Sequence, residues 1–146
     1  NKQLNSSIVF PTIIYGPGQK KDMLIPKIID SLINMKEFEI KNPSIYKDFI
    51  YIDDFVSFLV KFLSPADLNK NMYFAFSGKP IMIETLFNKI LKNFSNKLDH
   101  KVSLRKLVKS QEIKLNPLEA NKIFSKTSLK LGLSNTVNFM KLNNFK

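Results

Sequence analysis

Short runs of β-branched and aromatic residues alternate with stretches of helical periodicity along this chain. The run at residues 7–15 is interrupted by Pro11 and ends at Gly16-Pro17-Gly18, which is typical of a buried strand leading into a loop. From residue 25 to residue 33, isoleucine and leucine recur at the spacing of an amphipathic helix. This alternation predicts an α/β fold in which short strands alternate with helices.

The same reading gives the other expected elements. Strands are expected at residues 38–40, 49–52 and 72–76, with a turn at residues 42–44. Helices are expected from near Pro26 and at residues 55–63, 83–94, 118–124 and 129–142. Asp22 is the expected N-cap of the first helix, and Asp53 and Asp54 cap the second. Residues 102–108 fit a strand and a helix equally well, and residues 1–146 show no internal repeat or linker.

Residue content excludes several kinds of site. The chain has no cysteine, which excludes a disulfide scaffold, a thiolate zinc site and a cysteine nucleophile. Its single histidine, His100, excludes sites that need two imidazoles and is expected at the surface in a polar stretch. The longest apolar stretches, such as residues 55–60, are far shorter than the ~20 residues of a membrane span. The sequence begins at Asn1 without Met or a leader, and we expect a cut end there.

The positive charge is confined to one half of the sequence. Residues 1–84 hold 10 Lys and 9 acidic residues, a net charge of +1, and residues 85–146 hold 12 Lys, Arg105 and 3 acidic residues, a net charge of +10. An A/T-rich coding sequence explains the abundance of Lys, Asn, Ile and Phe. A face that binds a polyanion such as nucleic acid is the alternative, although such faces usually use Arg, and Arg105 is the only Arg.

No self-contained catalytic or metal-binding motif is visible. The sequence lacks a nucleophile elbow, a phosphate-binding P-loop and a dinucleotide-binding glycine pattern. Gly16-Pro17-Gly18 is not such a pattern, because no third glycine follows and Pro17 has no N–H for a phosphate. Asp53 and Asp54 are adjacent on a helix and point in different directions, which favours capping over a carboxylate pair. We therefore name no catalytic residue and no metal ligand.

Several short sequence motifs occur in a fixed order along the chain. They are YGPGQ at residues 15–19, LIP at 24–26, KDFIYIDD at 47–54, the apolar run and glycine at 73–78, and KTSL at 126–129 followed by Gly132-Leu133. This set resembles the C-terminal part of the extended short-chain dehydrogenase/reductase family, the NAD-dependent nucleotide-sugar epimerases and dehydratases. The resemblance covers nearly the whole chain.

The resemblance implies an architecture and an activity. Residues 1–146 would be the C-terminal, substrate-binding portion of a Rossmann-type enzyme. The glycine-rich loop, the acidic ribose ligand and the Tyr-x-x-x-Lys catalytic pair would precede Asn1, in a missing domain of about 150 residues or more. The intact protein would use NAD or NADP to act at C4 of a nucleotide-linked sugar, as an isomerase, lyase or oxidoreductase of carbohydrate biosynthesis. This chain alone is expected to be inactive.

The resemblance also implies individual contacts. Lys47 stands where the family usually has a phosphate-binding Arg, and it keeps the charge but loses the bidentate fork. Arg105 and Lys109 compete for a second phosphate contact. The other implied substrate-binding residues lie at a helix start and on a short strand beside the base: Met23, Leu24, Phe38, Glu39 and Ile40. Pro11 is the implied contact to the NAD or NADP cofactor. For Lys47 the alternative is a solvated lysine, and for Leu24 and residues 38–40 it is ordinary packing.

Three positions depart from the family pattern. Phe10 replaces an Arg, and Ile13 and Phe74 replace Asn residues, of which the one at Ile13 normally hydrogen-bonds the substrate. Apolar side chains cannot replace these polar contacts, so either the substrate is unusual or full activity is no longer needed.

Two other functions stay open at this stage. A nucleic-acid-binding module could use residues 85–146, and the chain could be a non-catalytic remnant of the enzyme family. Phe87 and Phe94 fall on an apolar helix face, which favours a core over an aromatic nucleic-acid-binding surface. A cytoplasmic location and a homodimer are expected from the resemblance, without a membrane partner.

Overall fold

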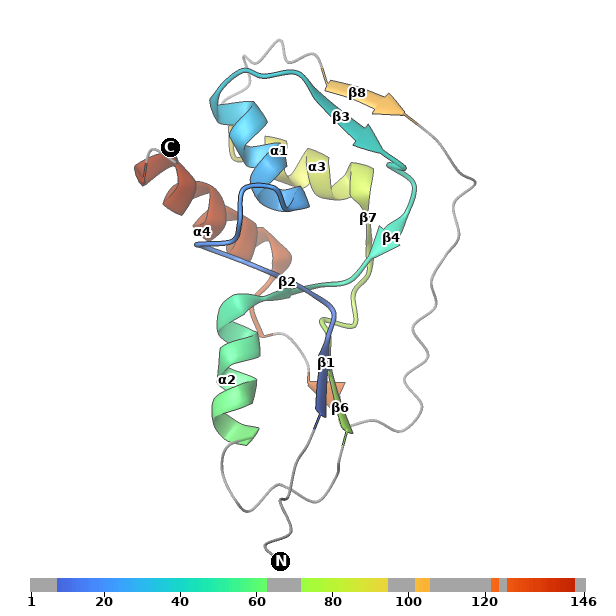
Figure 1. Cartoon of the computed structure of the whole chain (residues 1–146), viewed down its shortest axis with the longest axis vertical. Helices are drawn as coiled ribbons and strands as arrows, with labels where there is room; N and C mark the ends of the chain where they lie inside the picture. The colour runs from blue at the N-terminus through green and yellow to red at the C-terminus, as the bar shows by residue number, and fades with distance from the viewer. Residues whose placement is uncertain (1–7, 63–71, 95–101, 106–121, 124–125, 144–146) are drawn as a thin grey trace, which may run out of the picture.

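The computed structural model describes residues 8–62, 72–94, 102–105, 122–123 and 126–143 (Figure 1). Its helices are α1 (Leu24–Ile33), α2 (Ile52–Phe62), α3 (Ile83–Leu91) and α4 (Leu129–Leu142). Its strands are β1 (Ile8–Pro11), β2 (Ile13–Tyr15), β3 (Phe38–Lys41), β4 (Tyr46–Lys47), β5 (Phe49–Tyr51), β6 (Met72–Ala75), β7 (Ile81–Met82), β8 (Val102–Arg105) and β9 (Lys122–Ile123). The expected α/β class, with short strands alternating with helices, is confirmed.

The strands form small, mostly parallel sheets. β1, β6 and β9 make a parallel sheet in the order β1-β6-β9, while β2 pairs with β5 and β3 with β8, also in parallel. β4 and β7 form a short antiparallel pair. The chain changes sheet after Pro11: the Thr12 N–H bonds the Ala75 carbonyl of the first sheet, and the Ile13 N–H bonds the Asp48 carbonyl next to β5. Pro11 therefore ends one strand and leaves the next to pair elsewhere.

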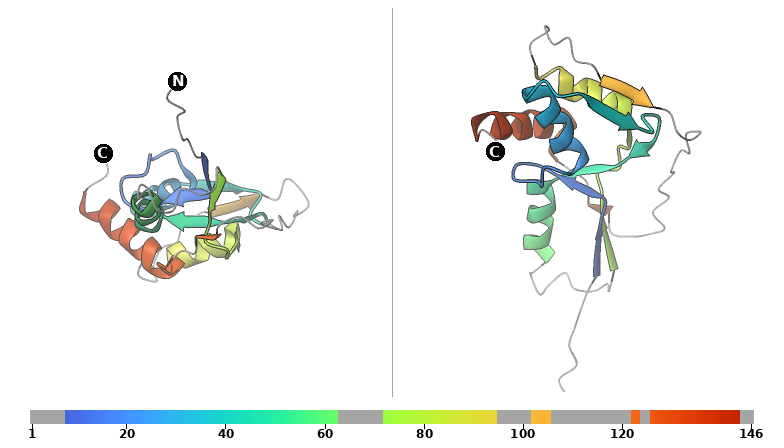
Figure 2. Two further views of the ribbon diagram at one scale, coloured as in Figure 1. Left: turned by 90° about the horizontal axis from the view of Figure 1, so that it is seen from below. Right: turned by 45° about the horizontal axis from the view of Figure 1, so that its top comes forward.

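Two apolar clusters hold the molecule together. The larger one packs α1, α3 and α4 around buried residues such as Ile28, Leu86 and Leu133. The smaller one lies between α2 and one face of the β1–β6 pair and includes Phe58 and Tyr73. In Figure 1 and in the right view of Figure 2, β1 and β6 extend away from α1, α3 and α4, with α2 alongside. No helix among the described residues is long and apolar enough to cross a membrane.

The opposite face of the β1–β6 pair is apolar and open to solvent. Ile8 faces Met72 across the pair, and Phe10 faces Phe74. All four side chains are exposed, and the rings of Phe10 and Phe74 stack with centroids 5.2 Å apart. The sequence-based expectation that this run is a buried strand is therefore wrong for β1. Parallel sheets are normally covered on both faces, so this face lacks a covering layer in the described part of the chain.

Several expected boundaries also need correction. Helix α1 begins at Leu24 after Met23 and has no side-chain cap, so Asp22 is not its N-cap. Helix α2 begins at Ile52, which puts Asp53 and Asp54 inside its first turn instead of at the cap. Within the expected helix at 118–124, Lys122–Ile123 is strand β9 because it pairs in parallel with β6. The expected helix at 129–142 is confirmed as α4, and residues 102–105 are a strand.

Candidate functional site

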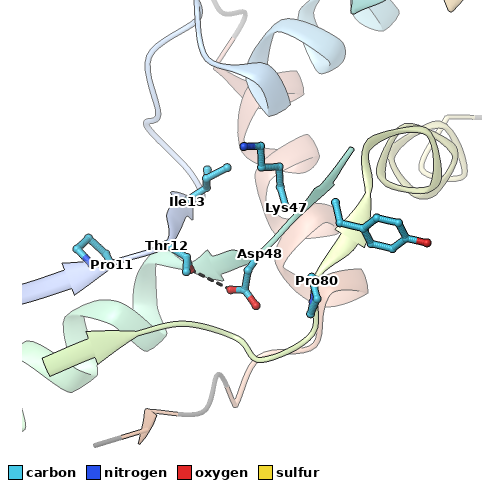
Figure 3. Close-up of a pocket in the computed structure, with 7 residues that line it drawn as sticks. Pro11, Thr12, Ile13, Lys47, Asp48 and Pro80 are labelled. Carbon is cyan, nitrogen blue, oxygen red and sulfur yellow. Dashed lines mark hydrogen bonds between the residues drawn. The ribbon is translucent and has the colours of Figure 1, made fainter. Parts of the chain in front are cut away.

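A cavity of about 310 Å³ opens where β1 ends and β4 gives way to β5. Its described lining residues come from three places in the sequence: Pro11, Thr12 and Ile13; Tyr46, Lys47 and Asp48; and Pro80 (Figure 3). The cavity lies at the carboxyl end of β1, and Ser77, which follows β6, is bonded to its wall. Ligands of parallel α/β sheets usually bind at this end of the strands.

Asp48 fixes the wall of this cavity. Its side chain is buried, with 4% of its surface exposed, and its two oxygens accept four hydrogen bonds. The Thr12 hydroxyl donates at 2.9 Å, the Ser77 N–H at 2.7 Å and the Ser77 hydroxyl at 2.9 Å; the Lys79 N–H donates at 3.1 Å. A carboxylate offers about four acceptor positions. Asp48 therefore holds three segments together and has no acceptor position left for a substrate.

Lys47 supplies the positive charge of the cavity. It is half-buried, lines the cavity and makes no ion pair within the described residues. Its neighbours in the wall, Ile13 and Pro80, offer no hydrogen bond from their side chains, and Tyr46 adds a phenol. An ammonium in an otherwise mostly apolar hollow can hold one anionic group while the apolar surface packs against the rest of a ligand.

The other implied substrate-binding residues lie away from this cavity. Met23 is exposed at the start of α1, and Leu24 packs against the larger apolar cluster. On β3, Phe38 is half-buried, Glu39 is exposed and the Ile40 side chain is 1% exposed. None of these five lines either described cavity.

For the proposed second phosphate contact, only a backbone position is known. Arg105 is the last residue of β8, opposite Lys41 of β3, and Lys109 lies outside the described residues, as does His100. Sequence reasoning missed Thr12, Tyr46, Asp48 and Pro80. The one available signal was the acid Asp48 inside the apolar run 47–52, because a charge at such a position needs partners when the strand is buried.

Tyr15 does not qualify as a proton-transfer residue. It is 2% exposed, and burial raises the pKa of its hydroxyl well above the usual value, with smaller contributions from Tyr51 and Asp54. A tyrosine that transfers protons near neutral pH needs a lowered pKa instead. The described residues contain no cluster of His, Asp or Glu side chains that could hold a metal ion.

The glycine turn serves packing. A Cβ placed on Gly16 would collide with the Ile52 side chain at the start of α2, so the glycine allows close contact between the turn and the helix. Pro11, the one residue implied to contact the cofactor, borders the cavity, and proline has no N–H to offer.

Two described aromatic residues of the basic half, Phe87 and Phe94, are buried. Phe87 in α3 and Phe94 just beyond it are 8% and 9% exposed and belong to the larger apolar cluster. A stacking platform for nucleic-acid bases would need such rings exposed between the lysines. Their burial confirms the expectation that they are core residues.

No family model and no curated protein matches the sequence. Among solved structures, MoeE5 in complex with UDP-glucose and NAD is similar with a TM-score of 0.75 and 16% identity, over 93% of this chain and 47% of that chain. A dTDP-glucose 4,6-dehydratase from Bacillus anthracis in complex with NAD has a TM-score of 0.76 and 14% identity, over 94% and 44%.

A third similar structure is the UDP-glucose 4-epimerase of Thermotoga maritima with UDP-glucose, at a TM-score of 0.73 and 16% identity, over 94% of this chain and 46% of that chain. The chain thus spans about half the length of the structures it resembles. At these identities the likeness shows the fold, which this chain shares with about half of each of these nucleotide-sugar enzymes.

Proposed function

We propose that this chain is the nucleotide-sugar-binding part of an NAD- or NADP-dependent epimerase, dehydratase or reductase that acts at C4 of the sugar. The observation that carries the proposal is the cavity at the carboxyl end of β1, where Lys47 brings a positive charge beside Pro11 and Ile13. The fold shared with nucleotide-sugar enzymes supports it. Residues 1–146 would then be one substrate-binding portion of a longer enzyme.

In this proposal, the residues that line the cavity have three different roles. The Lys47 ammonium holds a phosphate oxygen as a point charge, without the bidentate hydrogen bonds that an arginine makes. Pro11, Ile13 and Pro80 pack against less polar parts of the ligand and keep water out. Asp48 binds no ligand but keeps β2, β5 and residues 77–79 at a fixed separation through its four hydrogen bonds.

The open face of the β1–β6 pair is the proposed contact to the cofactor-binding domain. Ile8, Phe10, Met72 and Phe74 make it apolar, and a parallel sheet is stable when layers cover both faces. A Rossmann domain would supply that layer together with the residues that hold NAD or NADP, which, when bound, exchanges a hydride with the sugar. The chain by itself would then bind nucleotide sugar weakly and carry out no redox turnover.

Titration with UDP-glucose, followed by backbone amide NMR shifts, tests the binding part. We expect saturable shifts at residues 12–13 and 46–48 and about a fivefold weaker dissociation constant in Lys47→Gln, because one charge-assisted contact of about 1 kcal/mol is lost. Lys47→Arg should bind at least as tightly, since it restores the fork. Lys27→Gln, which removes an exposed lysine of α1, is the matched control and should change nothing.

Two results would contradict the proposal. One is UDP-glucose binding that Lys47→Gln and Lys27→Gln weaken equally, since the effect would then be one of net charge. The other is no saturable shift at the cavity up to millimolar UDP-glucose. A separate absorbance assay at the NADH band checks the redox part, and turnover by this chain alone would show that the cofactor site does not need another domain.

A further inference from the structure

A second, larger cavity of about 510 Å³ shares Pro80 with the first and opens between α3 and the start of α4. Its floor is formed by Tyr15 and Phe49, both buried, and its rim by polar side chains. A hollow of this size falls within the range of small-molecule sites. The proposed nucleotide-sugar contacts do not account for it.

Three lysines from separate elements converge on this cavity. Lys79 belongs to the loop after β6, Lys89 to α3 and Lys130 to the first turn of α4. None of them makes an ion pair within the part of the chain that the structure describes, and no carboxylate is among the described lining residues. Three like charges around one hollow repel each other, and an anion between them would relieve that repulsion.

The start of α4 adds to the positive potential. Its first turn contains Lys130 and no acidic residue, which is the reverse of what the helix dipole favours. The Ser128 side chain accepts the Leu131 N–H, and its own hydroxyl is a further donor at the cavity, as is the hydroxyl of Thr85. The cavity therefore combines three cations, two hydroxyl donors and a positive helix end.

We propose that the second cavity binds a small, multiply charged anion with the chemistry of a phosphate or pyrophosphate group. Lysine suits phosphate as a point charge, and three lysines match two or more negative charges. The site is distinct from the Lys47 cavity and does not depend on the nucleotide-sugar proposal. Free inorganic phosphates and phosphorylated metabolites share this chemistry.

Backbone amide NMR at constant ionic strength tests the site, with inorganic pyrophosphate in one arm and glucose 1-phosphate in the other. We expect saturable shifts at residues 77–79, 85 and 128–130 in at least one arm. The triple variant Lys79→Gln, Lys89→Gln and Lys130→Gln should weaken binding at least about tenfold, since each exposed charge contributes a factor of a few. The arm with the lower dissociation constant shows whether the cavity prefers an inorganic phosphate or a phosphorylated metabolite.

A charge-matched triple variant separates site binding from a general effect of net charge. Lys27→Gln, Lys61→Gln and Lys92→Gln remove three exposed lysines that do not line the cavity and should leave binding within about twofold. Equal weakening by both triple variants, or no saturable shift in either arm, would overturn the proposal.

Discussion

Asp48 shows how one side chain determines the shape of the candidate site. Its four hydrogen bonds join it to residues that lie 29 to 36 positions away in sequence. These residues are Thr12, which directly precedes β2, and Ser77 and Lys79 in the loop after β6. A buried carboxylate is tolerated only when its oxygens are paired in this way. The pairing also means that neighbouring Lys47, and not Asp48, is the charged group available to a ligand.

Asp48→Asn is predicted to destabilise the chain by about 2–4 kcal/mol. The amide keeps one acceptor oxygen, but its NH₂ group replaces the other oxygen and faces two donors, one N–H and one hydroxyl. Urea unfolding followed by circular dichroism measures the change. Asp53→Asn, an exposed residue in the first turn of α2, is the matched control and is expected to cost less than about 0.5 kcal/mol. Equal stability of Asp48→Asn and the parent chain would show that the four bonds add little.

Tyr15 makes stability depend on pH in the alkaline range. Because burial raises the pKa of its hydroxyl, the folded chain keeps this proton at pH values where the unfolded chain has lost it. The resulting stabilisation is complete below the unfolded value of about 10 and is lost as the pH rises beyond it. Tyr15→Phe should remove that part of the decline, by up to about 1.4 kcal/mol per pH unit.

Urea unfolding of both chains at pH 8, 10 and 11 checks this prediction. The informative quantity is the difference between parent and variant, since lysines and the other tyrosines titrate in both. A difference that stays constant over this range would mean that Tyr15 ionises as readily in the folded chain as in the unfolded one.

At the scale of elements, α4 packs on α1 and α3, and its start is also tied to α2 and β2. The Asp54 carboxylate in the first turn of α2 accepts the Thr127 N–H and hydroxyl, both at 3.0 Å, just before α4 begins. Gly132, in the second turn of α4, lies against the Tyr15 ring, and a Cβ there would collide with the Tyr15 hydroxyl. Close approach of the helix to β2 thus depends on a residue without a side chain.

Gly132→Ala is therefore predicted to destabilise the chain by about 1–3 kcal/mol, although alanine is the better helix former. Adding Tyr15→Phe removes the nearest atom and should recover part of the loss, but not all of it, because the ring of Tyr51 is also close. Thermal unfolding of the single and double variants measures the coupling. A Gly132→Ala chain that gains stability would show that α4 shifts to make room.

At the scale of the whole molecule, the two apolar clusters differ in how well they are covered. The cluster around α1, α3 and α4 has sixteen buried residues, whereas the cluster between α2 and the β1–β6 pair has four. The outer face of that pair is open and apolar, with Phe10 and Phe74 stacked on it. The region that would meet a second domain is thus the less well-packed part of the described chain. A homodimer of the whole protein stays a prediction.

Amide hydrogen exchange is predicted to show this difference. Amides of β6 should exchange at least about tenfold faster than those of α4 residues 133–140, which corresponds to about 1.4 kcal/mol in the free energy of local opening. Mass spectrometry of peptic fragments measures both regions in one sample. Equal protection of the two regions would show that the chain unfolds as one cooperative unit and that the open face does not weaken it.

The sequence by itself determined the local elements and the class of fold. Apolar periodicity at residues 129–142 predicted α4 to the residue, and the β-branched runs predicted β3, β5 and β6 within one or two residues. A helix depends on neighbours three or four positions away and a strand on neighbours two positions away, and a sequence pattern records both directly. The ordered sequence motifs at residues 15–19, 24–26 and 47–54 likewise indicated the fold that the solved structures share.

Only the tertiary structure decided where β1 and β2 separate, that Asp48 ties three segments together, and that Lys47 shares a cavity with Pro11 and Pro80. It also left Met23, Leu24 and β3 outside that cavity. The physical reason is that these contacts join residues about 30 to 70 positions apart. No local pattern encodes such distances, because they follow from how the sheets and helices pack.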